Sequence, residues 1–304
     1  MLATTNWPSV QPTAASDAVA VGLAPPAEAV AALEEVAVAF GGATVLEGVS
    51  LSVRRGEAVC LVGPSGGGKS TIVNLLAGLL APTRGRVFFE GRAVDGPGPE
   101  RAVVFQDAAL FPWLTLEANV AFPLEIAGVA PAERRARVDE LLRRVHLSRY
   151  RKAYVHELSG GMKQRGAIAR ALATRPRMML FDEPFAALDA QMREILQDEV
   201  EQVVHGAGTT IVFVTHQVDE AVRLGDRVVV VGAGKLLGEY SVELPRDKDA
   251  RTGTEARALA KRIGERIRAE VDLVAREEAE DGPWSTSDGG AERRRSDRPL
   301  GSRL

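Results

Sequence analysis

The amino-acid sequence predicts an α/β fold in which helices cover both faces of a largely parallel sheet. Glu57–Val62 is a short apolar segment, and Met178–Phe181 and Thr209–Val214 are continuous apolar runs. Such runs are typical of strands that are buried on both faces of a parallel sheet. Segments with apolar residues at helical spacing lie between them, and this alternation is typical of doubly wound folds.

Helices and a hairpin are expected in the intervals between these strands. A helix over Ser70–Leu80 is predicted from its apolar face, formed by Ile72, Leu75, Leu76 and Leu79. A second helix begins at Pro131, because proline is favoured in the first helical turn, and Asp189 is suited to cap a third. Two β-rich segments around a glycine-containing turn, Arg227–Val231 and Lys235–Tyr240, predict a hairpin.

Composition sets limits on the class of protein and on its domains. The 304 residues have a formal net charge of −3, which gives no bulk electrostatic argument for a nucleic-acid partner. Cys60 is the single cysteine and lies in an apolar run, so we expect a buried thiol and no internal disulfide. No stretch approaches the roughly 20 apolar residues of a membrane helix. We expect one folded domain at 32–276, with disordered segments at 1–31 and 277–304.

A complete phosphate-binding motif follows the first of the apolar strands. Its pattern is G-x-x-x-x-G-K-[ST], and the candidate phosphate-binding residues are Gly63, Pro64, Ser65, Gly66, Gly67, Gly68, Lys69, Ser70 and Thr71. Residues without a Cβ let backbone N–H groups turn toward phosphate oxygens. Lys69 supplies a positive charge for the phosphates, and the Ser70 hydroxyl is a hard ligand for Mg²⁺. The motif therefore predicts that the chain binds ATP.

Two further strand ends supply polar groups to the same edge of the predicted sheet. Leu180-Phe181-Asp182-Glu183 ends an apolar strand with two carboxylates, which would serve Mg²⁺ and the attacking water. His216 follows the strand that ends at Val214, where ligands of parallel sheets bind. Either signal alone is weak, because acidic strand ends and surface histidines are common. Their combination with the phosphate loop is what predicts a hydrolytic site.

Together with one more segment, these motifs resemble the ATP-binding-cassette (ABC) ATPases. Leu158-Ser159-Gly160-Gly161-Met162-Lys163-Gln164 looks like the signature motif of that family. The resemblance, which runs from about Leu33 to Leu244, implies a P-loop fold with a mixed core sheet. It also implies an N-terminal antiparallel β subdomain, a helical subdomain at about 107–175 and a C-terminal helix at about 254–276. In the family, Ser159, Gly160 and Gly161 of one copy would close on ATP held by the phosphate loop of a second copy.

The resemblance assigns roles to the remaining candidates. Gln106 is similar to the Q-loop glutamine that contacts Mg²⁺ and water, and Asp189 to the D-loop residue at the dimer interface. His216 resembles the switch histidine that binds the γ-phosphate. Phe40 occupies the position of the adenine-stacking aromatic residue, where the family often has tyrosine. Thr215-His216-Gln217 departs from the usual T-H-D and lacks the neighbouring carboxylate.

The segment Phe111–Val120 and the region from Val242 to Ile267 are similar to the importer subfamily for nitrate, sulfonates and taurine. This implies an importer subunit on the cytoplasmic face of the inner membrane. Its partners would be membrane permease subunits and, indirectly, a solute-binding protein. An importer ATPase for an unrelated solute stays open. So do a non-transport ABC ATPase of DNA repair or translation and a P-loop kinase or GTPase, although no basic face or Asn-Lys-x-Asp motif supports them.

Overall fold

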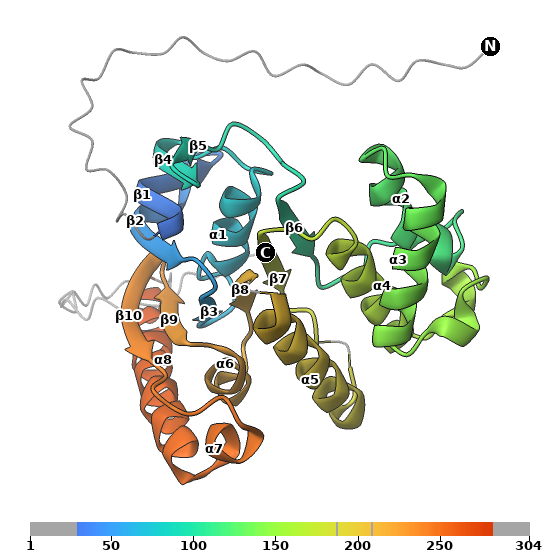
Figure 1. Ribbon diagram of the computed structural model, residues 1–304. Helices are drawn as coiled ribbons and strands as arrows, with labels where there is room; N and C mark the ends of the chain where they lie inside the picture. Colours follow the sequence, from blue (N-terminus) through green and yellow to red (C-terminus); the bar gives the residue numbers. More distant parts are fainter. Residues whose placement is uncertain (1–28, 187, 208, 282–304) are drawn as a thin grey trace, which may run out of the picture.

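The computed structural model describes residues 29–186, 188–207 and 209–281 of the chain. Figure 1 shows two sheets beside a group of helices that lies apart from them. The sheets form the core of the molecule, and the separate group contains the helices α2 (Leu116–Ile126), α3 (Pro131–Arg144) and α4 (Gly160–Leu172). The predicted α/β architecture is confirmed.

The larger sheet has six strands in the order β10-β9-β3-β8-β7-β6. Their bounds are Ala58–Val62 for β3, Arg101–Val104 for β6, Met178–Asp182 for β7, Thr210–Val214 for β8, Arg227–Gly232 for β9 and Lys235–Ser241 for β10. The pairs β6–β7, β7–β8, β8–β3 and β3–β9 are parallel, and β10 returns antiparallel to β9. The predicted hairpin is therefore present, and it makes the sheet mixed.

Both faces of this sheet are covered by other elements. Alternate residues of each strand point to opposite faces, so each strand contributes to two hydrophobic clusters. On one face, Val59 and Leu61 of β3 pack in a cluster with α1 (Lys69–Ala77) and the smaller sheet. On the other face, Cys60 and Val62 pack in a cluster that also includes residues of α5 (Ala190–Ala207), α6 (Val218–Leu224) and α8 (Thr254–Asp281). The Cys60 thiol is fully buried, as expected.

The smaller sheet is antiparallel, with the order β2-β1-β4-β5. Its strands are β1 (Ala29–Phe40), β2 (Ala43–Arg54), β4 (Arg84–Phe89) and β5 (Arg92–Ala93). β1 begins within the segment that the sequence led us to expect as a disordered extension. α8 likewise continues past residue 276, so the bounds of the ATPase domain stay a prediction.

The helices α2, α3 and α4 have a hydrophobic cluster of their own, which includes Leu116, Leu124, Leu142 and Ala169. Short 3₁₀ turns at Ser148–Tyr150 and Val155–Glu157 connect α3 to α4. We call residues 107–175 the helical region. α4 also contributes Ala167 and Ile168 to the cluster on the larger sheet, so it joins the helical region to the core.

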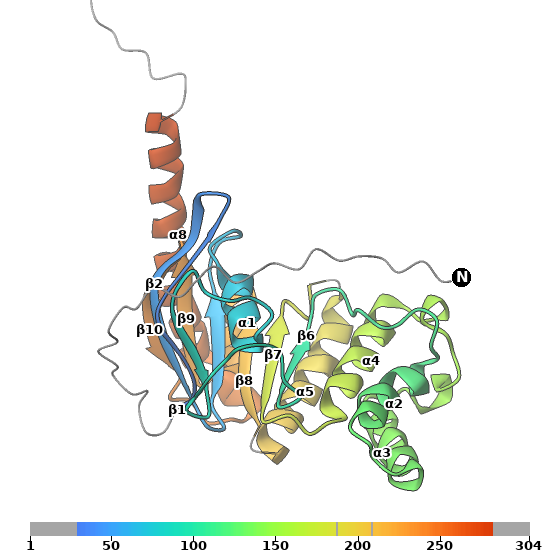
Figure 2. The same cartoon turned by 90° about the horizontal axis from the view of Figure 1, so that it is seen from above.

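The chain ends, within the described residues, in the short helix α7 (Lys248–Thr252) and the long helix α8. Figure 2 shows the distal part of α8 projecting beyond the sheets. Among the residues that the structure describes, no helix combines the length and apolar character needed to cross a membrane.

One predicted helix is shorter than expected. α1 ends at Ala77 because Gly78 takes a positive φ of 76° and its N–H bonds back to the carbonyls of Asn74 and Leu75. A Cβ on Gly78 would lie 2.1 Å from the Gly96 carbonyl oxygen, so the termination depends on glycine. The prediction that Leu79 shares the apolar face was wrong, since Leu79 lies beyond the helix and is 51% exposed.

Candidate nucleotide-binding and hydrolysis site

The candidate phosphate-binding residues form the connection between β3 and α1. Gly63, Gly66 and Gly68 all have positive φ values, of 146°, 78° and 102°, a backbone conformation that favours glycine. The loop leads directly into the N-terminus of α1, where unpaired backbone N–H groups and the helix dipole favour an anion. The loop geometry is therefore suited to a phosphate group.

The loop lies against the β9–β10 hairpin and the strand β2. A Cβ on Gly63 would lie 1.9 Å from the Val231 carbonyl oxygen, and one on Gly68 would lie 2.4 Å from the Leu46 side chain. These close approaches explain, beyond the torsion angles, why two positions of the motif must be glycine here. Distant parts of the chain thus fix the shape of the loop.

Lys69 is the buried cation of the site, only 5% exposed. Its Nζ donates hydrogen bonds to the Gly63 carbonyl at 3.0 Å and the Pro64 carbonyl at 2.7 Å, within the loop itself. Burial lowers the pKa of Lys69, and the nearby carboxylates of Glu183 and Asp182 partly offset that effect. The ammonium group is held where it can meet an incoming phosphate.

The strand β7 brings two carboxylates to the loop. Ser70 Oγ donates a hydrogen bond to Asp182 Oδ1 at 2.9 Å, so a hydroxyl and a carboxylate oxygen lie side by side at the start of α1. Burial raises the pKa of Asp182, and the charge of Glu183 raises it further, while Ser70 and Lys69 act in the opposite direction. Oxygen ligands of this kind fit Mg²⁺, which is usually bound through few protein groups.

Glu183 and His216 face each other across two adjacent strand ends. Glu183 Oε2 lies 3.5 Å from His216 Nδ1. Glu183 has a positive φ of 46°, and its N–H bonds to the Val214 carbonyl at 3.1 Å, so the carboxylate turns out of the strand line. The structure brings together Lys69, Ser70, Asp182, Glu183 and His216, as the motif positions predicted.

Gln217, the residue that departs from the family pattern, has a defined partner. Its side-chain oxygen accepts a hydrogen bond from Arg193 Nη1 at 3.1 Å, and Arg193 Nη2 donates to the Leu188 carbonyl at 3.0 Å. Arg193 Nε is buried without a partner in the described structure. Arg193 thus joins the segment after His216 to the segment before Asp189.

Gln106 follows β6 and is exposed. The preceding residue, Phe105, accepts a hydrogen bond on its carbonyl oxygen from Gln164 Nε2 at 3.0 Å. Gln164 lies on α4 and is only 4% exposed, so it joins the Gln106 segment to the helical region.

The signature segment lies in the helical region, at the start of α4. Ser159 is the N-cap of this helix, and its Oγ accepts a hydrogen bond from the Met162 N–H at 3.3 Å. In the described part of the chain, no hydrogen bond or ion pair joins residues 159–161 to the phosphate loop. A Cβ on Gly160 would meet no atom within 4 Å, so this surface is open.

Two other candidates lie at exposed places. Phe40 ends β1 beside the turn Gly41–Gly42 and is 54% exposed. Asp189 is exposed and directly precedes α5. Their roles stay predictions.

Sequence reasoning missed three residues that shape the site, namely Val231, Gln164 and Arg193. Val231 was counted only as part of a strand, although its carbonyl oxygen faces Gly63. Gln164 ends the signature segment, and nothing in that pattern shows that its side chain reaches the Phe105 carbonyl. Arg193 gave no signal in the sequence, because its two partners lie on separate loops.

Comparisons with known proteins decide the family. The model of the ABC transporter family matches residues 46–186. An uncharacterized ABC transporter ATP-binding protein of Methanocaldococcus jannaschii is 45% identical over 228 residues, which are 74% of this chain and 85% of the relative. This chain belongs to the ABC transporter family. It is accordingly an ATPase that binds ATP through a P-loop fold.

A solved ABC cassette has the same fold. It is a dimeric ATP-binding cassette in a post-hydrolysis state with ADP and phosphate, 32% identical, and the match covers 70% of this chain and 99% of that one with a TM-score of 0.64.

Two relatives have names that state a solute. A bicarbonate transport ATP-binding protein of Synechococcus elongatus is 47% identical over 67% of this chain and 31% of the relative. A spermidine/putrescine import ATP-binding protein of Nitrosospira multiformis is 46% identical over 65% of this chain and 55% of the relative.

Proposed function

We propose that this ABC ATPase is the ATP-hydrolysing subunit of an importer and works as a head-to-tail dimer on the cytoplasmic face of the inner membrane. The observation that carries the proposal is the split between two anion-binding surfaces. The phosphate loop and its carboxylates lie in the core, whereas the N-terminus of α4 with Ser159 lies in the helical region. A second copy of the chain would supply the signature segment that completes each site.

The residues at the core have complementary roles in hydrolysis. The phosphate loop and Lys69 bind the phosphates of ATP, and Ser70, Asp182 and Gln106 are the candidate ligands of Mg²⁺. When bound, Mg²⁺ neutralises charge on the phosphate oxygens. Glu183 orients the water for in-line attack, and His216, 3.5 Å from its carboxylate, contacts the γ-phosphate. Ser159 and the α4 N-terminus of the second copy stabilise the charge that develops on the transferred group.

The exposed residues Phe40 and Asp189 also have roles in the head-to-tail dimer. Phe40 would stack on the adenine ring, and its exposed side chain is available for that contact. Asp189 would lie at the interface between the two copies. The dimeric state of the solved cassette supports this arrangement.

The helical region offers a surface for a membrane subunit. Phe111 packs against Trp113 and Phe122, with ring centroids 5.5 Å and 4.8 Å away, and Trp113 remains 71% exposed. Exposed aromatic side chains of this kind favour a partner. We assign this surface, beside Gln106, to a helix of a permease subunit. Motion of the helical region on dimer closure would then reach the transport pathway.

The solute class is a finer proposal. The likeness of Phe111–Val120 to the nitrate, sulfonate and taurine subfamily and the bicarbonate relative both favour a small anion. The spermidine/putrescine relative, at nearly the same identity, supports an importer and leaves a different solute as the alternative. Loss of uptake of one such anion in a strain without this gene, restored by the gene, would support the proposal. Unchanged uptake of all of them would favour the alternative.

Mixed dimers test the shared site. Lys69→Ala removes the phosphate-binding ammonium, and Ser159→Arg blocks the signature surface. Each variant alone should be inactive, whereas a mixture contains dimers with one intact composite site and should recover up to about a quarter of wild-type turnover. A mixture that associates and yet recovers no turnover would overturn the head-to-tail arrangement.

Co-purification tests the transport role separately. The chain, extracted with its membranes in detergent, should be recovered with a permease subunit. Recovery without any membrane protein, under conditions where the dimer persists, would favour a non-transport ABC ATPase.

A further inference from the structure

We infer that the junction between the helical region and the core holds a second anion site, which accepts a small ligand with more than one phosphate group. The site is a cavity of about 480 Å³ at the amino end of β7. We call it the arginine pocket, after its five lining arginines, Arg55, Arg137, Arg144, Arg175 and Arg177. Glu140 is the one carboxylate among its described lining residues.

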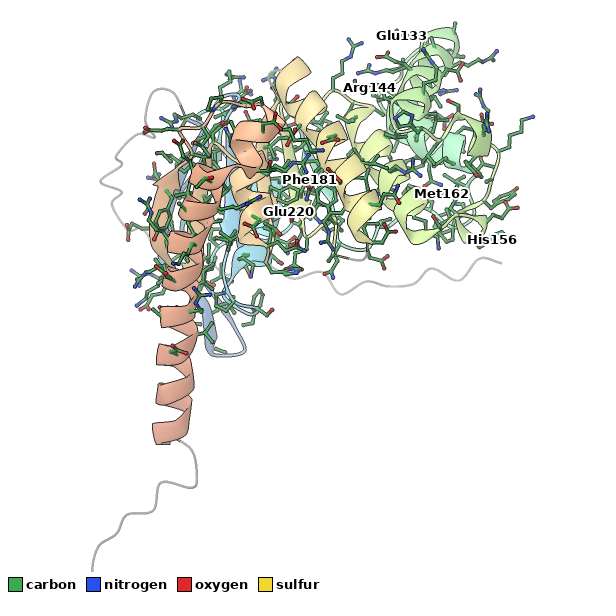
Figure 3. All side chains as sticks on the ribbon, turned by 90° about the horizontal axis from the view of Figure 1, so that it is seen from below. Glu133, Arg144, His156, Met162, Phe181 and Glu220 are labelled. Atoms are coloured by element: carbon green, nitrogen blue, oxygen red, sulfur yellow. The ribbon has the colours of Figure 1, made fainter. Side chains whose placement is uncertain are left out.

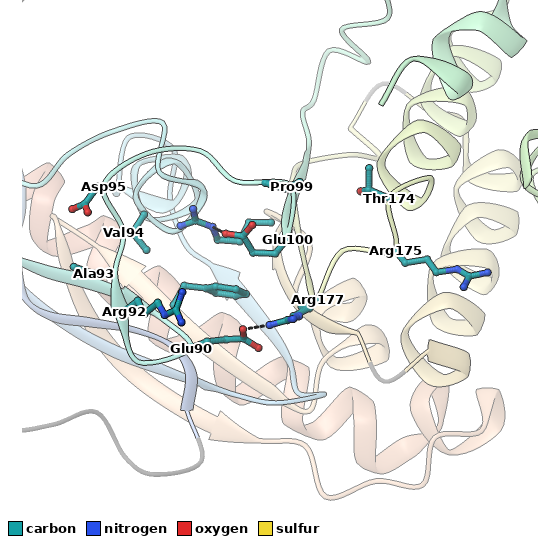
Figure 4. A pocket seen from close by; sticks show the side chains of 12 residues that line it. Glu90, Arg92, Ala93, Val94, Asp95, Pro99, Glu100, Thr174, Arg175 and Arg177 are labelled. Carbon is teal, nitrogen blue, oxygen red and sulfur yellow. Dashed lines mark hydrogen bonds and ion pairs between the residues drawn. The ribbon is translucent and has the colours of Figure 1, made fainter. Parts of the chain in front are cut away.

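Two of the five arginines have an ion-pair partner. Arg55 Nη2 lies 2.9 Å from Glu90 Oε1, and Arg177 pairs with the other oxygen of the same carboxylate. Figure 4, which shows the neighbouring cavity, draws the Arg177–Glu90 pair and shows Arg175 pointing away from it, toward the helices. One carboxylate thus pairs with two guanidinium groups, so Arg55, Arg177 and Glu90 together retain a net positive charge.

The other three arginines have no ion pair within the described residues. Arg137 and Arg144 lie on α3, and Arg175 lies in the connection between α4 and β7. Arg137 Nη2 is buried and donates no hydrogen bond to any described residue. A buried, unpaired donor is unfavourable, and an anion in the cavity would satisfy it.

The guanidinium groups are close enough to affect each other. Burial lowers the pKa of Arg137 and the positive charge of Arg175 lowers it further, while the carboxylates of Glu133 and Glu140 partly offset both effects. Arg175 also has a positive φ of 52°, directly before Pro176, a backbone conformation that is uncommon for a side chain of this size. Arg137 is partly buried, whereas Arg144 and Arg175 are exposed, so a ligand can reach the three guanidinium groups from solvent.

The pocket lies at the opposite end of the sheet from the nucleotide site. Arg177 directly precedes β7, whereas Asp182 ends that strand at the phosphate loop. Figure 3 shows Arg144 on the core side of the helical region, with Glu133 further out. The pocket is therefore a separate site, and its assignment does not depend on the proposed transport role.

The chemistry of the lining selects the ligand class. Arginine forks bind phosphate oxygens in pairs, and three unpaired forks on two sides of a cavity suit two linked phosphate groups better than one. A volume of about 480 Å³ admits such a ligand. Bound there, it would bridge α3 of the helical region and the segment Arg175–Arg177, which leads into β7 of the core.

Pyrophosphate is the probe that tests this site, measured by isothermal titration without nucleotide or Mg²⁺. The Lys69→Ala background removes the competing phosphate loop. Pyrophosphate should bind with a stoichiometry of one per chain. The double substitution Arg137→Gln and Arg144→Gln should weaken binding at least about tenfold, because it removes two charge-assisted donors. Orthophosphate, the second probe, should bind at least about tenfold more weakly than pyrophosphate.

A matched control uses the same helix and the same change in charge. Arg135 and Arg143 lie on α3 and do not line the pocket, so Arg135→Gln with Arg143→Gln should alter binding less than about twofold. Glu140→Gln removes the lining carboxylate and should tighten pyrophosphate binding a few-fold. If the first double variant fails to fold, this variant shows whether pyrophosphate binds in the arginine pocket. No binding in the Lys69→Ala background, equal loss in both double variants, or equal affinity for the two probes would overturn the proposal.

Discussion

The core and the helical region hold their candidate residues in different ways. In the core, Gly63 is packed against the Val231 carbonyl, and Ser70, Asp182 and Glu183 are fixed on strand and helix ends. In the helical region, Ser159 is held by one cap bond, Gln164 donates a hydrogen bond to the Phe105 carbonyl, and α4 packs on the core through Ala167 and Ile168. The core thus holds its candidate residues by close packing, whereas the helical region presents Ser159 and Gly160 at an open surface.

The largest effect is expected from the candidate catalytic carboxylate of the core. Glu183→Gln keeps the size of the side chain but removes the base, so turnover should fall by about 10²–10⁴-fold while ATP still binds. ATPase assays and nucleotide binding measure the two quantities. Glu133→Gln, an exposed change on α3, is the matched control and should leave turnover within about twofold.

Substantial turnover in the Glu183→Gln variant would place the base elsewhere. Loss of turnover in the control would show that the two regions are less independent than the contacts indicate.

Glycine substitutions compare the packing of the two regions directly. Gly63→Ala would place a Cβ 1.9 Å from a carbonyl oxygen at a positive φ, so the free energy of unfolding should fall by roughly 2–4 kcal/mol. Gly160→Ala meets no atom within 4 Å and should change it by less than about 0.5 kcal/mol. Denaturant unfolding of the nucleotide-free chain measures both. Equal destabilisation would contradict the difference between the regions.

The link between the regions should have a smaller effect. Gln164→Leu leaves the Phe105 carbonyl without its buried donor, which costs about 1–2 kcal/mol, and frees the Gln106 segment. Turnover should fall about three- to tenfold, whereas the ATP affinity of the isolated chain should not change. Steady-state kinetics measures the turnover, and titration with ATP measures the affinity. Equal losses in affinity and turnover would indicate a structural role for Gln164 only.

What the sequence predicted well was local. Short apolar runs identify the strands at whose carboxyl ends lie the phosphate loop, Asp182, Glu183 and His216. Because these strands are parallel, their carboxyl ends lie at one edge of the sheet. The strand order placed them together without any knowledge of side-chain contacts. The end of α1 could not be placed, because helical periodicity continues through Leu79 and only the close approach of Gly78 to Gly96 shows why the helix stops.

The contacts that sequence reasoning missed are long-range. Val231 faces Gly63, Gln164 bonds Phe105, and Arg193 joins Leu188 to Gln217, in each case across loops or subdomains. The arginine pocket is a similar case, since its five arginines come from the β2–β3 turn, α3 and the α4–β7 connection. A motif defines residues that act on a shared ligand, whereas residues that position the motif are specified by packing.

The smallest effect concerns the stability of the core itself. Burial raises the pKa of Asp182, so the folded state binds that proton more tightly than the unfolded state does. Stability contributed by this group is therefore present at low pH and is lost as the pH rises through the raised pKa. Asp182→Asn keeps an acceptor for Ser70 without the buried charge, and should stabilise the nucleotide-free chain at pH 7 by about 1 kcal/mol or less.

Thermal unfolding at about pH 7 and about pH 4 checks this, because the gain should shrink as the pH falls and the carboxyl group takes up a proton. Asp95→Asn, an exposed change, is the control and should alter stability by less than about 0.5 kcal/mol. If Asp182→Asn stabilises the chain and also abolishes hydrolysis, a carboxylate of the core is retained for chemistry at the expense of stability. If it destabilises the chain, the attraction of the charged carboxylate to Ser70 and Lys69 outweighs the cost of burying its charge, and this functional residue also stabilises the core.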